Sequence, residues 1–227
     1  MAATGNLKTA AELDDALRLL DHEVQGLNMD KPLRVRAIGG YALMKHGVRK
    51  GARAYTVDID TVTKRYSAEV ERAIQVVADK LGLDKDWLNN DNVMDDDPEQ
   101  VEDMLEARWL PQPLGLRNVH VEIATIDTLT RAKIIAAEDA EFSGRDRDLP
   151  DLLDLLEHQK ITSTQAFRAK YPDTYGEYGV VASQVQDHFA RERARKTAAS
   201  EVGRRFPELS DTGVDATEPE IEHDIEH

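Results

Sequence analysis

Residues 34–60 constrain the fold of this chain more than any other segment. Residues 35–38 form a short run with β-strand propensity, and two adjacent glycines, Gly39 and Gly40, follow where the chain must turn. Residues 41–46 suit a short helix, and a further glycine comes directly after them. The segment therefore predicts a strand, a glycine turn, a helix and then a second strand.

The second strand is expected over residues 56–62, where β-branched side chains alternate with other residues. This alternation places Asp58 and Asp60 on one face of the strand. Two carboxylates on one face repel each other, so a bound cation is an economical reason to keep both. The glycine turn beside them suits a phosphate group. The alternative is a tight turn followed by a solvated strand face.

These residues resemble the DNA polymerase beta-like nucleotidyltransferase superfamily. The resemblance rests on Ile38-Gly39-Gly40 followed by Asp58-Ile59-Asp60. The double glycine and the long spacer are most similar to the AbiEii-type group, which includes toxins and uncharacterised members. In that group an arginine and a hydroxyl residue commonly precede the acid pair. Thr56 matches the hydroxyl, whereas Arg53 lies one residue earlier than expected.

Three further positions follow from the resemblance. Residues 118–124 alternate as a strand, and Glu122 on it matches a third carboxylate that acts as metal ligand or base. Lys133, on the next expected helix, matches a lysine that contacts nucleotide phosphates. Asp148 belongs to an Arg-Asp string that organises the cleft in the family. From the residues alone, Glu122 also suits a cross-strand ion pair, and Asp148 suits an ordinary helix start.

The resemblance implies a magnesium-dependent nucleotidyltransferase with two Mg²⁺ ions held by Asp58 and Asp60. The catalytic residues would be Asp58, Asp60 and Glu122. A nucleoside triphosphate would be the donor, bound by Gly39, Gly40, Arg53, Thr56, Lys133 and Asp148. The acceptor would be RNA such as tRNA, or a protein, and the chain would act as a toxin with a cognate antitoxin. Two alternatives stay open: a catalytically degenerate, antitoxin-like binding protein, and a small-molecule transferase of the aminoglycoside kind.

Composition limits other classes of function. The chain has 227 residues and no cysteine, which excludes disulfides, thiol nucleophiles and thiolate-bound zinc. The net charge of −15 is concentrated in two acidic stretches, residues 86–106 and 208–227, neither of which contains Lys or Arg. By contrast, residues 31–57 carry seven Lys or Arg and no acid, which favours a phosphate-bearing ligand. No apolar run is long enough to span a membrane, and we expect a cytoplasmic protein.

The pattern of helices and strands predicts an α+β fold of the nucleotidyltransferase type. Amphipathic helices are expected over residues 7–27 and 67–81, on one side of a mixed sheet. Residues 84–100 are expected to form a long loop, with Asp95, Asp96 and Asp97 in solvent. We expect an α/β core over residues 1–126, a helical C-terminal region over 127–206 and a disordered acidic tail over 207–227.

Overall fold

A computed structural model of the chain describes residues 7–27, 29–91, 93, 97–143, 147–172 and 180–205. The chain divides into two compact units, residues 1–185 and 186–227. The first unit contains the whole sheet and the candidate site, and the second begins within the last helix. The predicted acidic tail, together with Asp95 and Asp96, lies outside the described residues.

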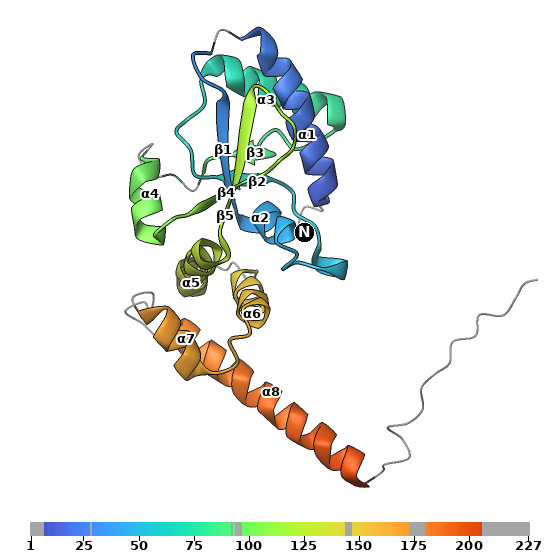
Figure 1. Cartoon of the computed structure of the whole chain (residues 1–227), viewed down its shortest axis with the longest axis vertical. Coiled ribbons are helices and arrows are strands. Elements are labelled where there is room, and N and C mark those ends of the chain that lie inside the picture. Colours follow the sequence, from blue (N-terminus) through green and yellow to red (C-terminus); the bar gives the residue numbers. More distant parts are fainter. Residues whose placement is uncertain are drawn as a thin grey trace, which may run out of the picture. The chain divides into compact units, whose positions relative to one another are not determined.

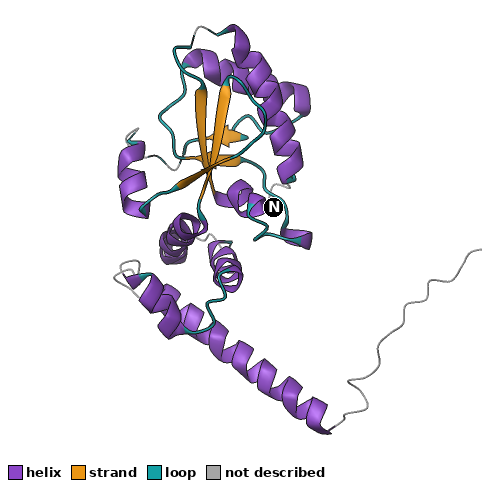
Figure 2. Ribbon diagram, viewed as in Figure 1, coloured by secondary structure: helices purple, strands orange, loops and turns teal. Residues whose placement is uncertain are grey.

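The first unit is an α+β fold built on one mixed five-stranded sheet, as predicted (Figure 2). The strand order is β3-β2-β1-β5-β4. The central strand β1 pairs parallel with β5 and antiparallel with β2, and β2 pairs parallel with β3. The antiparallel strand β4 closes the other edge. The strands are β1 (Leu33–Ile38), β2 (Ile59–Thr61), β3 (Leu88–Asn89), β4 (Trp109–Pro111) and β5 (Val119–Ala124).

Helices flank the sheet (Figure 1). Two short 3₁₀ turns, Val24–Gly26 and Gly51–Arg53, complete the secondary structure of the described residues. The α-helices are α1 (Ala10–Glu23), α2 (Gly39–Lys45), α3 (Ala68–Leu81), α4 (Pro98–Leu105), α5 (Ile126–Ser143), α6 (Asp148–His158), α7 (Thr164–Lys170) and α8 (Val180–Arg205).

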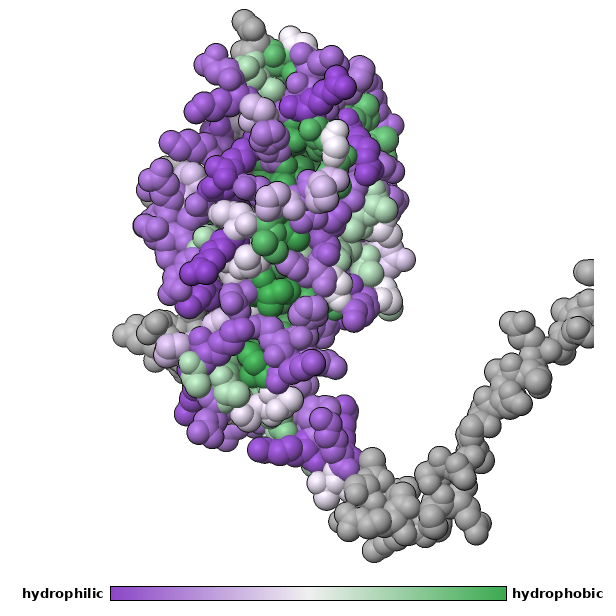
Figure 3. Space-filling model, in the orientation of Figure 1, coloured by the Kyte–Doolittle hydropathy of each residue, from purple (hydrophilic) through white to green (hydrophobic). Residues whose placement is uncertain are grey.

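The hydrophobic core lies on one face of the sheet. Val35 and Ala37 of β1 point into it with every second residue of β5, and α1 and α3 pack their apolar stripes against them. Hydrophilic side chains cover most of the face of this unit seen in Figure 3, with hydrophobic residues showing in a narrow band. A capping box of Thr9 and Glu12 begins α1, and Gly82 in the left-handed conformation ends α3.

Four local predictions differ from the structure. The strand expected over residues 56–62 is shorter, because Thr56 instead forms an isolated bridge with Lys8. The loop expected over residues 84–100 contains the short edge strand β3, and β4 was not predicted; both have too few residues to show alternation. Asp127 has the short acidic side chain of a typical helix N-cap, which predicts that the helix starts there, but α5 begins one residue earlier, at Ile126. Thr125 serves there, since its Oγ1 accepts the Thr128 N–H at 3.3 Å.

Within the part of the chain that the structure describes, no helix combines the length and the apolar character needed to cross a membrane.

Candidate functional site

The turn from β1 into α2 brings the two glycines against the second strand. Gly39 has φ +67°, and a Cβ atom there would collide with the carboxylate of Asp60. A Cβ atom on Gly40 would lie 2.6 Å from both Arg49 Nη1 and Thr56 Oγ1. Glycine is therefore required at both positions by the close approach of Asp60, Thr56 and Arg49, of which the sequence had assigned Asp60 and Thr56 to one site.

Asp58 and Asp60 form an electrostatically coupled pair. Asp58 lies just before β2 and accepts a hydrogen bond from Thr56 Oγ1 at 3.2 Å, while Asp60 lies within β2. Burial raises the pKa of Asp58 to about 6, the negative charge of Asp60 adds to the rise, and the Thr56 bond opposes it. The charge of Asp86, which lies two residues before β3, raises the pKa of Asp58 further.

A magnesium ion fits this pair. Mg²⁺ is commonly bound by one or two carboxylates, with substrate phosphates and water supplying the other oxygens. A cation would also offset the repulsion that raises the pKa of Asp58. Among the residues that the structure describes, no group of three or more His, Cys, Asp or Glu side chains is arranged to hold a metal ion. The protein would therefore contribute two carboxylates.

Arg49 is the residue of this site that the sequence analysis missed. Its guanidinium group donates through Nη1 to the Tyr55 carbonyl oxygen at 3.0 Å and lies against Gly40. Arg53, the predicted arginine, instead donates to Asp151 and Asp154 at 2.8 and 2.6 Å. The sequence signal that could have found Arg49 is the basic stretch after α2. The spacing between these basic residues and the acid pair gave no reason to prefer Arg49 over Arg53.

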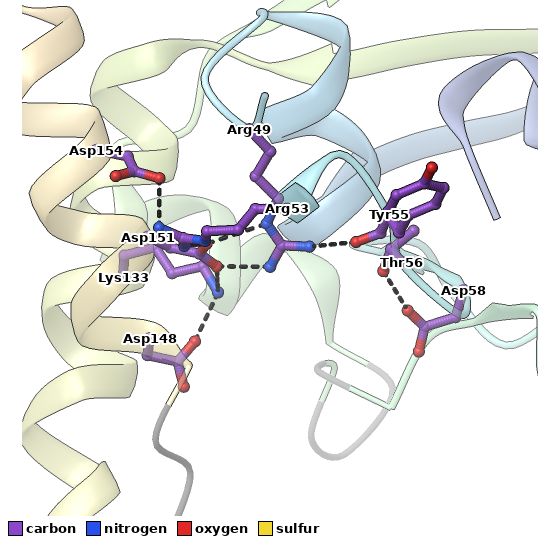
Figure 4. A network of polar contacts seen from close by, with 9 residues as sticks. All are labelled: Arg49, Arg53, Tyr55, Thr56, Asp58, Lys133, Asp148, Asp151 and Asp154. Carbon is purple, nitrogen blue, oxygen red and sulfur yellow. Dashed lines mark hydrogen bonds and ion pairs between the residues drawn. The ribbon is translucent and has the colours of Figure 1, made fainter. Parts of the chain in front are cut away.

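Asp151 of α6 collects three cations in the network drawn in Figure 4. It is only 1% exposed and pairs with Arg49 at 2.7 Å, Arg53 at 2.8 Å and Lys133 at 3.1 Å. Burial acts to raise the pKa of Asp151, but the hydrogen bond and charge of Arg49 and the charge of Lys133 outweigh it and hold the pKa below its usual value. The network ties α5 and α6 to the segment that follows α2.

Lys133 and Asp148 belong to the same network. The ammonium group of Lys133 donates to Asp148 Oδ1 at 2.6 Å, and both side chains are largely buried. The structure thus brings Arg53, Lys133 and Asp148 into one network: Asp151 pairs with Arg53 and Lys133, and Lys133 pairs with Asp148 (Figure 4). Arg49 links this group to Gly40 and, beyond it, to Thr56 and the acid pair.

Glu122 lies elsewhere on the sheet. It pairs with Arg36 across β5 and β1, whereas Asp60 pairs with Ile38 across β2 and β1. The offset is two strands and two residues, about 10 Å across and about 7 Å along the sheet. Glu122 accepts hydrogen bonds from Arg34 at 2.7 Å and Arg36 at 3.2 Å, and the Arg34 bond lowers its pKa. Its role as a third carboxylate stays a prediction.

No protein-family model, curated protein or solved structure matches this chain. The geometry of the site is therefore the basis for proposing a function.

Proposed function

We propose that this chain is a magnesium-dependent nucleotidyltransferase that transfers a nucleoside monophosphate from a nucleoside triphosphate to an acceptor. One observation carries the proposal: Asp60 of the acid pair lies directly against the double-glycine turn, with no room for a Cβ atom between Gly39 and the Asp60 carboxylate. A metal-bound triphosphate needs this juxtaposition, because its phosphates must reach carboxylate-held metal and backbone N–H groups together.

Asp58 and Asp60 would hold the magnesium, with two ions expected as in two-metal phosphoryl-transfer sites. When bound, the metal supplies positive charge to the triphosphate oxygens and activates the acceptor oxygen. Thr56 holds Asp58 through its hydroxyl, and this hydrogen bond fixes the carboxylate beside Asp60. Thr56 is therefore a positioning residue for the acid pair.

The cations next to the turn would bind the phosphates. Arg49 is 13% exposed, and its guanidinium lies against Gly40, where a phosphate group would approach the backbone. Lys133 offers an ammonium group whose two aspartate partners hold it in place. Gly39 and Gly40 carry no side chain, so Asp60, Arg49 and Thr56 can pack directly against the turn beside which the phosphates would lie.

The reaction that this site suits is an in-line displacement at the α-phosphorus. An acceptor hydroxyl oxygen forms a bond to phosphorus, the bond to the bridging oxygen breaks, and pyrophosphate leaves with Arg49 and Lys133 near its charge. The acceptor's proton passes to water. Positioning and charge stabilisation would provide most of the rate enhancement.

Calorimetric titration with ATP, CTP, GTP and UTP, with and without Mg²⁺, tests the proposal. We expect magnesium-dependent binding of at least one triphosphate, lost in Asp58→Ala/Asp60→Ala. The matched control is Asp15→Ala/Asp79→Ala, which removes two exposed carboxylates from α1 and α3. If Asp58→Ala/Asp60→Ala bound the triphosphate with the same affinity as the wild type, these two acids would not be the magnesium ligands.

A second candidate function is nucleotide binding without transfer, as in a degenerate, antitoxin-like relative. The ion pairs of Glu122 with Arg34 and Arg36 favour this second function, because a carboxylate paired with two arginines serves the structure rather than the metal. Binding of a triphosphate without release of pyrophosphate in the presence of RNA or protein acceptors would support this alternative.

The toxin role and the aminoglycoside-type reaction are tested separately. Growth arrest on expression, abolished by Asp58→Ala, is the expected sign of a toxin. A small cationic acceptor would need an acidic pocket, and a cavity of about 680 Å³ between α3 and β3 has three acids, Glu71, Asp86 and Asp91, and two cations, Arg65 and Lys85, in its lining. Transfer to an aminoglycoside, lost when Asp91 and Glu71 are replaced by amides, would establish that reaction.

A further inference from the structure

A backbone pairing joins the segment before α1 to the candidate site. The N–H of Lys8 donates to the Thr56 carbonyl oxygen at 2.7 Å, and the Thr56 N–H donates to the Lys8 carbonyl oxygen at 3.0 Å. The two residues form an isolated antiparallel bridge. Within the part of the chain that the structure describes, these are the only backbone hydrogen bonds of Thr56. The place of the Thr56 backbone is therefore set by Lys8.

The sheet holds one member of the acid pair but not the other. Strand β2 begins at Ile59, so Asp58 precedes the ladder that fixes Asp60 against β1. The Asp58 carboxylate instead accepts the Thr56 hydroxyl at 3.2 Å. The bridge at Lys8 therefore reaches the acid pair through a single residue, Thr56.

Thr56 is packed closely on the glycine turn. Its Oγ1 and Cβ atoms lie 2.6 and 2.9 Å from the position that a Cβ atom would take on Gly40. Its neighbour Tyr55 accepts a hydrogen bond from Arg49 at the carbonyl oxygen, as Figure 4 shows. One short stretch of chain thus contacts the glycine turn, the acid pair and the cation network, and Lys8 holds that stretch by its backbone.

The segment that carries Lys8 is itself anchored to the core. Thr9 is the N-cap of α1: its Oγ1 accepts the Glu12 N–H at 3.3 Å, and the Glu12 carboxylate accepts the Thr9 N–H at 2.8 Å. Farther along the helix, Leu13 and Leu17 are fully buried. Because Lys8 directly precedes this cap, it gives Thr56 a fixed support.

The same segment adjoins the cations of the site. Leu7 and Tyr55 are exposed hydrophobic side chains, and both line a cavity of about 300 Å³ together with Arg49 and Arg53. The residue before Lys8 thus borders the space beside the arginine that lies against the glycine turn. The segment before α1 is therefore a neighbour of the site on the side of the acids and on the side of the cations.

We propose that Lys8 is a positioning residue of the magnesium site: its backbone holds Thr56, and Thr56 holds Asp58 beside Asp60. The inference rests on the proposed function for the magnesium and the triphosphate. Residues that orient a metal ligand typically change metal affinity by about ten- to hundredfold when they are replaced. The expected effect is therefore on the affinity for magnesium, and it comes from the main chain of Lys8, not from its side chain.

Lys8→Pro tests the bridge, because proline has no N–H to donate to the Thr56 carbonyl oxygen. The measurement is calorimetric titration with whichever of ATP, CTP, GTP and UTP the wild type binds most tightly, at a series of Mg²⁺ concentrations. We expect the Mg²⁺ concentration that gives half-maximal binding to rise about tenfold. Triphosphate affinity at saturating Mg²⁺ should stay close to that of the wild type. A loss of stability alone would reduce binding at every Mg²⁺ concentration without moving this midpoint.

Three further variants show whether the backbone acts through Thr56. Lys8→Ala keeps the N–H and should have the wild-type midpoint. Ala10→Pro should have it too, because proline is tolerated at the first residue of a helix and Thr9 before it is already extended. Thr56→Val removes the hydroxyl and should raise the midpoint as Lys8→Pro does. Lys8→Pro/Thr56→Val should then be no worse than Thr56→Val alone.

Several outcomes overturn the inference and leave the proposed function standing. One is a wild-type midpoint in Lys8→Pro. Another is a rise in Ala10→Pro as large as that in Lys8→Pro, and a third is additive effects of Lys8→Pro and Thr56→Val. Should Lys8→Pro not fold, Thr9→Ala takes its place, since it keeps the Lys8 N–H but removes the cap that anchors it. A wild-type midpoint in Thr9→Ala then overturns the inference.

Failure of the proposed function gives a different pattern. A wild type that binds no triphosphate overturns the proposed function, and the midpoint is then read from the stabilisation by Mg²⁺ alone in thermal denaturation. A higher midpoint for Lys8→Pro than for Lys8→Ala in that measurement supports the positioning role. Equal midpoints overturn it, and a wild type that Mg²⁺ does not stabilise overturns both.

Discussion

The guanidinium group of Arg49 and the carboxylate of Asp151 form a two-point ion pair, with Nε to Oδ1 at 3.0 Å and Nη2 to Oδ2 at 2.7 Å. The two residues are 102 positions apart in the sequence. The pair holds Arg49 against Gly40 while its remaining nitrogen bonds the Tyr55 carbonyl. Helix α6 therefore fixes a cation at the glycine turn, so the helices that follow the sheet help to shape the site.

Removing Asp151 should destabilise the protein strongly. Asp151→Ala leaves Arg49, which is 13% exposed, as an uncompensated buried charge and removes one of the two aspartate partners of Lys133, so we expect a loss of about 3–5 kcal/mol in the free energy of unfolding. Asp154→Ala is the control, since it removes only the partially exposed pair with Arg53 and should cost less than about 1 kcal/mol. Urea denaturation measures both. Equal losses would mean that the buried pairs add nothing beyond a surface contact.

Gly39→Ala should abolish magnesium-dependent triphosphate binding. The added methyl group meets the Asp60 carboxylate in a left-handed backbone conformation, so the acid must move. Gly82→Ala is a matched control, because Gly82 has nearly the same φ but no atom within 4 Å of the added Cβ. Both variants should lose about 1–2 kcal/mol of stability from backbone strain, measured by denaturation. Titration calorimetry should show loss of magnesium-triphosphate binding for Gly39→Ala but not for Gly82→Ala. Normal binding by Gly39→Ala would show that the glycine turn is not part of the binding site.

Stability in the absence of metal should depend on pH through Asp58. Its pKa is about 6 in the folded protein against an ordinary 3.8, so the folded state holds this proton more tightly than the unfolded chain. The contribution of Asp58 to the free energy of unfolding therefore falls as pH rises from about 4 to about 6. Asp58→Asn lacks this change, so its stability relative to the wild type should rise across that window.

Urea denaturation in EDTA at several pH values checks this dependence on Asp58. The matched variant is Asp15→Asn, which neutralises an exposed aspartate on α1 and should follow the wild type at every pH. Adding Mg²⁺ at neutral pH should stabilise the wild type more than Asp58→Asn, because a cation offsets the repulsion within the acid pair. A constant difference between wild type and Asp58→Asn from pH 4 to 6 would contradict the raised pKa.

The sequence was sufficient for the features that depend on local pattern. The glycine turn, the stripes of α1 and α3 and the alternation of β5 are each set by neighbouring residues, and the α+β class follows from them. The ion network is different, because Asp151 finds Arg49 and Lys133 only when α5 and α6 fold against the segment after α2. The sequence pattern pointed to Arg53, but in the structure Arg53 pairs with Asp151 and Asp154, whereas Arg49 is the arginine that lies against Gly40.

Glu122→Gln distinguishes a third carboxylate from a residue that positions arginines. Its offset from Asp60 by two strands, and its hydrogen bonds from Arg34 and Arg36, lead us to expect unchanged magnesium-triphosphate binding. The free energy of unfolding should fall by about 1–3 kcal/mol in urea denaturation, because Glu122 no longer accepts charged hydrogen bonds from the two guanidinium groups. Asp60→Asn is the comparison, and it should abolish triphosphate binding. If Glu122→Gln and Asp60→Asn instead lose triphosphate binding to the same extent, Glu122 belongs to the metal site, and the arginines of β1 are oriented by Glu102 alone.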